Sequence, residues 1–180
     1  MMESNGRKRL SKGLVQVYTG DGKGKTTAAL GLAMRAAGQG LKVIFIQFVK
    51  GQPDCGEHYF VAKYQPFEMV QLSHGDAFKK PRDLLASEAR VTLAYAEKAL
   101  ASGDYDMVVL DEVLIAVRDG LLTEQQVLDL MKKRPGNVEL VLTGRGAPPQ
   151  VMREADLVTE MLLIKHPFNE GVAGRCGIEY

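Results

Sequence analysis

The sequence predicts an α/β fold with a mainly parallel sheet flanked by helices. Short apolar runs of strand length alternate with segments of helical periodicity, which is typical of successive βαβ units. A glycine-rich stretch, TGDGKGKTT at residues 19–27, joins the first apolar run to the first helical segment. The 180 residues fit one domain, with no internal repeat. We therefore expect a single P-loop α/β domain at residues 13–180, preceded by a flexible basic arm at residues 1–12.

The first half of the chain is expected to begin with a strand, a helix and a second strand. Residues 14–18 are β-prone, and the helix after the glycine-rich stretch ends at two glycines. Residues 41–49 (LKVIFIQFV) are apolar almost without interruption, which is typical of a parallel strand covered on both faces. Residues 50–82 hold a candidate short helix, a strand-like run at 67–72 and a polar loop.

The second half of the chain continues the alternation of helices and strands. Ala, Leu and Glu recur at helical spacing before Gly103, and a later helix opens on TEQQ, which has the form of an N-cap. A further short helix should follow the sequence TGRGAPP. The expected helices are 83–100 and 123–133, and the expected strands are 106–110, 137–142 and 157–164.

The composition argues against several classes of function. The 23 basic and 22 acidic side chains give a net charge of +1, so a broad nucleic-acid-binding surface is not expected. No apolar run is long enough to span a bilayer, and residues 1–13 lack the apolar core of a secretory signal. Cys55 and Cys176 lie far apart, which suggests a reducing compartment. We expect a cytoplasmic protein that binds neither nucleic acid nor membrane.

The glycine-rich loop is the strongest motif and indicates a site for nucleotide phosphates. Its glycines let backbone N–H groups approach phosphate oxygens, and the helix that follows adds its own free N–H groups. Lys25 would add positive charge, and the Thr26 hydroxyl is placed to bind Mg²⁺. Counted from Gly20, the loop is one residue shorter than G-x-x-x-x-G-K-[ST]. A glycine turn with no ligand is the alternative. The residues expected at the phosphates are Gly20, Asp21, Gly22, Lys23, Gly24, Lys25, Thr26 and Thr27.

Two acidic residues follow the strand at 106–110. Asp111 and Glu112 would face the crevice at the carboxyl edge of the sheet, where open α/β sheets bind ligands. Mg²⁺ in such a site takes few carboxylates, together with phosphate oxygens and waters. Because adjacent residues of an extended chain point to opposite sides, we expect one of the two to touch the metal. A solvated pair that caps a helix is the alternative.

Weaker signals leave their alternatives open. Arg145, in a TGRG turn after a strand, is a candidate contact to phosphate or to a neighbouring subunit, or an exposed residue of a tight turn. Residues 1–12 form either a mobile tail or an arm that orders over a ligand or a partner subunit. No Ser-His-Asp or Cys-His arrangement indicates a protein nucleophile, so we expect the attacking group to belong to a substrate.

Five segments together point to one family. They are YTGDGKGKTTAALGLAMRAAGQG, IQFVKG, DMVVLDEV, ELVLTGRGAP and KHPFNEGVAGRCGIEY, in this order. They resemble the blocks of the CobA/BtuR-type ATP:corrinoid adenosyltransferases, also called cob(I)alamin adenosyltransferases. The resemblance implies a RecA-like P-loop fold, a homodimer, and transfer of the 5′-deoxyadenosyl group of ATP to the Co(I) centre of a reduced corrinoid such as cobalamin, with release of triphosphate. It also implies an electron donor such as a flavoprotein reductase, and a role in adenosylcobalamin biosynthesis or salvage.

The resemblance also assigns roles to residues of the nucleotide site. Residues 20–27 match the family's phosphate loop, and Thr26 and Glu112 match its Mg²⁺ ligands. Arg35 matches a basic position suited to the nucleotide. Lys25 would stabilise the leaving triphosphate and is the candidate catalytic residue.

For the corrinoid, the resemblance points to residues 75–80. Phe78 matches an aromatic residue of the corrinoid pocket, whereas Lys80 stands where family members carry Trp. Arg145 and His166 are candidates for a nucleotide or interface role. Two other functions are open: an ordinary P-loop kinase or NTPase, against which the short loop argues, and a non-catalytic module that binds ATP or corrinoid.

Overall fold

The computed structural model describes residues 9–49, 55–73, 75 and 79–180. Within these ranges the strands are β1 (Val15–Thr19), β2 (Val43–Gln47), β3 (Glu68–Gln71), β4 (Met107–Asp111), β5 (Glu139–Thr143) and β6 (Leu157–Glu160). They form one sheet in the order β3-β2-β4-β5-β1-β6, and every neighbouring pair is parallel. The predicted α/β fold with a mainly parallel sheet is therefore confirmed.

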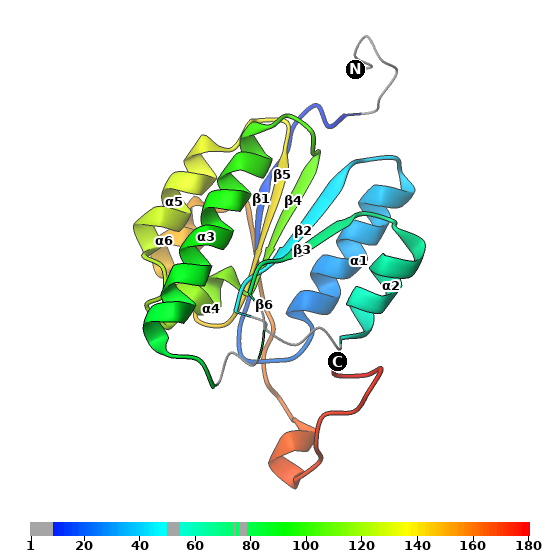
Figure 1. The fold of residues 1–180 in the computed structure, drawn as a ribbon, viewed down its shortest axis with the longest axis vertical. Helices are drawn as coiled ribbons and strands as arrows, with labels where there is room; N and C mark the ends of the chain where they lie inside the picture. Colours follow the sequence, from blue (N-terminus) through cyan, green and yellow to red (C-terminus); the bar gives the residue numbers. More distant parts are fainter. Residues whose placement is uncertain (1–8, 50–54, 74, 76–78) are drawn as a thin grey trace.

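Helices cover both faces of this sheet. They are α1 (Lys25–Gly38), α2 (Gly56–Tyr64), α3 (Arg82–Ala101), α4 (Val113–Arg118), α5 (Glu124–Lys133) and α6 (Pro149–Glu154). Figure 1 shows α1 and α2 on one face and the other four helices on the opposite face. The predicted N-cap of α5 is present as a capping box, in which Thr123 and Gln126 exchange hydrogen bonds.

The core consists of two apolar layers, one on each face of the sheet. Alanines of α1 pack against one face, around Phe45 and Val109. Helices α3 to α6 pack against the other face, around Ile46, Leu110 and Leu142. Every residue of β2, β4 and β5 is buried, which explains why their sequences are apolar almost without interruption.

The last strand is shorter than its sequence indicates. The apolar run predicts a strand over 157–164, but β6 ends at Glu160; the Met161 N–H then donates to the Thr19 carbonyl, and the Met161 carbonyl accepts from the Gly22 N–H. The partner strand β1 ends at Thr19, where the chain turns into the glycine-rich loop, so β1 offers no further strand residues to continue the ladder. That part of the prediction is wrong.

The sheet brings the carboxyl ends of its strands to one edge. The glycine-rich loop follows β1, the acidic pair lies at the end of β4, and the TGRG turn follows β5. These three segments are far apart in sequence, and the strand order β4-β5-β1 makes them neighbours.

The predicted arm at 1–12 lies largely outside the described residues, although Arg9 donates a hydrogen bond to the Gly103 carbonyl. No helix in the described part of the chain is both long and apolar enough to cross a bilayer.

Candidate functional site

The glycine-rich loop rests on the backbone that follows β6. The Gly22 N–H donates to the Met161 carbonyl at 2.7 Å. A Cβ on Gly20 would lie 2.5 Å from the Met161 oxygen, and one on Gly22 would lie 2.6 Å from the Leu162 oxygen. Gly20 also has a φ of +93°, which side chains disfavour. These two glycines are thus required by a close backbone approach as well as by any phosphate.

Lys25 turns back onto its own loop. Its ammonium donates to the Gly20 and Gly22 carbonyls, both at 2.7 Å. The side chain is 7% exposed, and burial lowers the pKa of Lys25. A phosphate that enters the loop would offer this ammonium stronger acceptors than the two carbonyls.

The carboxylate of Asp111 joins the loop to two strands. Its Oδ1 accepts hydrogen bonds from the Thr26 hydroxyl at 2.9 Å and from the Thr143 hydroxyl at 2.7 Å. Asp111 is fully buried. The sequence predicts that one of the two residues Asp111 and Glu112 contacts the metal. In the structure, it is Asp111 that contacts the side chain of Thr26, the predicted Mg²⁺ ligand.

Glu112 lines the same pocket in a strained backbone conformation. Its φ of 62° lies in the left-handed region, which costs a non-glycine residue about 1–2 kcal/mol. Its N–H donates to the Thr143 hydroxyl at 2.9 Å, which helps to hold it there. Strain of this kind concentrates at functional sites. The assignment of Glu112 as a metal ligand stays a prediction.

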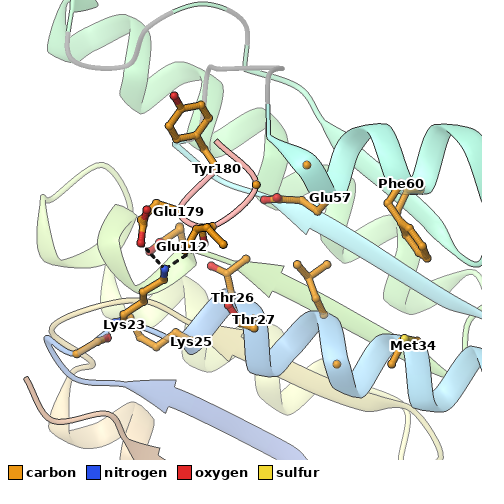
Figure 2. Close-up of a pocket in the computed structure, with 18 of the residues that line it drawn as sticks. Lys23, Lys25, Thr26, Thr27, Met34, Glu57, Phe60, Glu112, Glu179 and Tyr180 are labelled. Carbon is orange, nitrogen blue, oxygen red and sulfur yellow. Dashed lines mark hydrogen bonds and ion pairs between the residues drawn. The ribbon is translucent and has the colours of Figure 1, made fainter. Parts of the chain in front are cut away.

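These groups open into a pocket of about 720 Å³. Figure 2 shows Lys23, Lys25, Thr26 and Glu112 at one end of it and Met34 and Phe60 away from them. Its polar end is formed by the loop, and its apolar side by α1 and α2. The other lining residues include Leu30, Glu57, Val61, Phe67, Arg145, His166, Gly177, Ile178, Glu179 and Tyr180.

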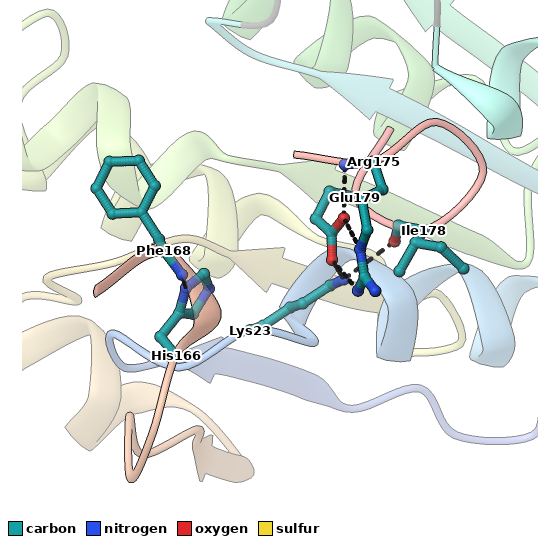
Figure 3. Close-up of polar contacts among 6 residues, drawn as sticks. All are labelled: Lys23, His166, Phe168, Arg175, Ile178 and Glu179. Carbon is teal, nitrogen blue, oxygen red and sulfur yellow. Dashed lines mark hydrogen bonds and ion pairs between the residues drawn. The ribbon is translucent and has the colours of Figure 1, made fainter. Parts of the chain in front are cut away.

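Residues 165–180, which we call the covering segment, close one side of this pocket. Lys23 of the loop donates to the Ile178 carbonyl at 3.0 Å and to the Glu179 carboxylate at 2.9 Å. Arg175 also donates to Glu179, and hydrogen bonds from Arg175 and Lys23 hold the pKa of Glu179 well below its usual range (Figure 3). The sequence had marked only His166 of this segment as a candidate; it lines the pocket and accepts a hydrogen bond from the Phe168 N–H.

The other predicted site residues lie in varied places. Arg145 lines the pocket. Arg35 is exposed in the last turn of α1, and neither Arg35 nor Asp21 is among the described residues that line the pocket. Phe78 lies outside the described residues. Lys80, at the position where Trp was expected, donates to both carboxylate oxygens of Glu88 on α3 at 2.7 Å.

Comparisons with known proteins agree with the resemblance drawn from the motifs. Residues 11–180 match the family model described as ATP:corrinoid adenosyltransferase BtuR/CobO/CobP. The chain is 38% identical to a corrinoid adenosyltransferase of Pseudomonas aeruginosa, covering 96% of this chain and 86% of that one. It is 35% identical to one of Escherichia coli K12 and 34% identical to one of Salmonella typhimurium, covering 94% of this chain and 86% of the relative in each case.

A solved structure supports the fold alone. The chain resembles a KaiC-like protein of Pyrococcus horikoshii with a TM-score of 0.53 and 18% identity, over 83% of this chain and 72% of the other. The likeness agrees with the RecA-like P-loop architecture expected from the sequence.

Proposed function

The chain belongs to the BtuR/CobO/CobP family of ATP:corrinoid adenosyltransferases, and we propose the following account of its reaction and its site. The protein transfers the 5′-deoxyadenosyl group of ATP to the Co(I) centre of a reduced corrinoid and releases triphosphate. The observation that carries this proposal is the short GDGKGKTT loop, which opens into one pocket with Glu112 and the Ile178–Tyr180 end of the covering segment.

The chemistry requires the protein to stabilise a leaving group. The electron pair of Co(I) forms the new bond to C5′ of ATP, and the C5′–O bond breaks with its electrons passing to the triphosphate. The nucleophile therefore comes from the substrate, as the sequence led us to expect. The protein contributes positive charge and N–H groups at the departing oxygens, together with alignment of the two substrates.

Lys25 is the residue best placed for this task. When the triphosphate binds, its ammonium exchanges the Gly20 and Gly22 carbonyls for phosphate oxygens. The Lys25 ammonium needs to move only a short way, because both carbonyls belong to the loop that would surround the phosphates. Lys23 is a second positive charge of the loop, and Glu179 must share it with the incoming anion.

The residues present fit a magnesium ion. The Thr26 hydroxyl lies 2.9 Å from Asp111 Oδ1, and Glu112 lines the same pocket, so the donors are hard oxygens of the kind Mg²⁺ takes. Mg²⁺ in proteins commonly takes one or two carboxylates and completes its ligand shell with phosphate oxygens and waters. Thr26 together with Asp111 or Glu112 would hold it, and its charge would offset that of the triphosphate.

Several finer features rest on the family and on the sequence. We propose that the enzyme acts in the cytoplasm as a homodimer and receives its electron from a donor such as a flavoprotein reductase. The dimer is supported by β6, an edge strand whose four residues are all exposed, and by the exposed apolar residues Leu162 and Ile164 that follow it. Phe78 remains the proposed aromatic contact to the corrinoid.

The decisive experiment is anaerobic incubation with ATP, Mg²⁺ and chemically reduced cobalamin. We expect a light-sensitive Co–C product, detected by its absorption spectrum. Triphosphate should form in equal amount. Release of ADP or phosphate without a Co–C bond would instead indicate a kinase or NTPase. Tight ATP binding with neither outcome would indicate a non-catalytic module.

A further inference from the structure

A buried glutamine lies directly behind the Asp111 carboxylate. Gln47 is the last residue of β2 and pairs with Asp111 in the register of β2 and β4. Its side chain is fully buried, and its Nε2 donates to Asp111 Oδ2 at 3.3 Å. A buried amide at the carboxyl edge of the sheet is expensive unless it is hydrogen-bonded, so its orientation is well determined.

The other end of the Gln47 amide is held by α2. His58 Nε2 lies 2.5 Å from Gln47 Oε1. Because that oxygen only accepts, the hydrogen must lie on His58 Nε2. The hydrogen bonds therefore run in one direction, from His58 to Gln47 and from Gln47 to Asp111. Reversal of the amide would set its oxygen against the Asp111 carboxylate, so the carboxylate determines the orientation of the amide and, through it, the His58 tautomer.

This chain of bonds leaves Asp111 oriented on both oxygens. Gln47 occupies Oδ2, while Oδ1 accepts the hydroxyls of Thr26 and Thr143. A carboxylate held at both ends cannot rotate, so the hydroxyl of Thr26 is also held in place. Outer residues of this kind commonly orient the groups that bind a metal or a phosphate.

The same bonds connect α2 to the phosphate loop. Helix α2 lines the pocket through Glu57, Phe60 and Val61, yet of its nine residues only Val61 is buried. Its packing against the body of the protein is therefore light, and the His58–Gln47 hydrogen bond ties it to the fully buried end of β2.

We propose that Gln47 and His58 are positioning residues of the nucleotide site, which hold Asp111 in the orientation that fixes Thr26 and which tie α2 to that carboxylate. The proposal deepens the proposed function, because it concerns the same ATP and Mg²⁺ site. It concerns how that site is built and does not depend on the fate of the bound ATP.

The test measures binding by calorimetry, for Mg²⁺-ATP and for ATP in EDTA. Gln47→Leu, which keeps the approximate volume, should weaken Mg²⁺-ATP binding by about 10-fold. His58→Phe, which keeps a ring but loses the donor, should weaken it by about 3-fold. Binding of ATP in EDTA should change little in both variants, because the loop N–H groups and Lys25 are untouched. His58→Gln, which can still donate to the Gln47 oxygen, should restore the affinity, and Lys63→Ala on the exposed side of α2 serves as the matched control.

The outcomes separate positioning from a merely structural role. Unchanged Mg²⁺-ATP affinity in Gln47→Leu and His58→Phe would overturn the proposal, as would equal losses with and without Mg²⁺. Failure of His58→Gln to recover above His58→Phe would also overturn it. If Gln47→Leu does not fold, the comparison of His58→Phe with His58→Gln tests the proposal instead. Because binding is measured without corrinoid, a wild-type protein that binds Mg²⁺-ATP but forms no Co–C bond would refute the proposed function and leave this test intact.

Discussion

Replacement of Lys25 by Met tests the central electrostatic claim about the loop. Met keeps the length and apolar stem of the side chain and removes only the ammonium. A unit charge about 4 Å from a developing negative charge is worth about 4 kcal/mol at an effective dielectric constant of about 20. Loss of one such donor in other enzymes costs about 10²–10³-fold in rate, or about 2.7–4 kcal/mol. We therefore expect Lys25→Met to slow adenosyl transfer by about 10²–10³-fold at saturating ATP.

The fold should tolerate this change. The ammonium is nearly buried and its burial lowers its pKa, so the two hydrogen bonds to the loop carbonyls already offset an unfavourable desolvation. We expect the free energy of unfolding to shift by no more than about 1–2 kcal/mol.

The assay is single-turnover formation of the Co–C bond under anaerobic conditions, with urea unfolding measured in parallel. Lys98→Met, on the exposed side of α3, is the control and should leave both quantities unchanged. A folded Lys25→Met protein that transfers the adenosyl group at the wild-type rate would refute the role of Lys25.

Three further predictions concern the surroundings of the loop. Gly22→Ala should lower the free energy of unfolding by about 1–3 kcal/mol, because its Cβ would meet the Leu162 carbonyl; an unchanged urea midpoint would contradict that close approach. Glu179→Gln should raise the affinity for tripolyphosphate, measured by calorimetry, because it removes the negative charge that competes with the phosphates for Lys23; a loss of affinity, or the same result in Glu170→Gln, would argue against competition. Burial and a hydrogen bond to a β3 carboxylate raise the pKa of Tyr105 from 10.0, so its neutral form stabilises the fold below pH 10 and this contribution is lost as the pH rises through the raised pKa. The stability of Tyr105→Phe should therefore fall less steeply above pH 10 in urea unfolding, and equal slopes would contradict the sign.

Local patterns predicted most of the fold. The buried strands at 43–47, 107–111 and 139–143 are apolar except at their ends, where Gln47, Asp111, Glu139 and Thr143 lie, because helices cover both sheet faces. The cap of α5 could be recognised from the four residues TEQQ alone. Helix α4 escaped prediction because six residues are too few to show a period, and because Glu112 begins it from a left-handed conformation. The end of β6 depends on where its partner strand stops, which its own sequence does not contain.

The site was predictable where contacts are local. Lys25 and Thr26 follow from the motif, because the spacing within one loop determines their placement. The choice between Asp111 and Glu112 for contact with Thr26 depends on how β4 meets β1 and β5, so two adjacent acids could not be told apart. The contact of Lys23 with Glu179 spans 156 residues and has no local signature.

The support of the loop by residues 161–162 has a consequence for the order in which the protein matures. Synthesis delivers the phosphate loop early, but the backbone on which Gly22 rests and the carboxylate that Lys23 holds arrive about 140 and 156 positions later. A nascent chain that has completed β1 and α1 therefore carries the motif without its support. We therefore expect the support of the nucleotide site to be complete only after β6 has joined the edge of the sheet, so that ATP binding reports on the folding of that edge.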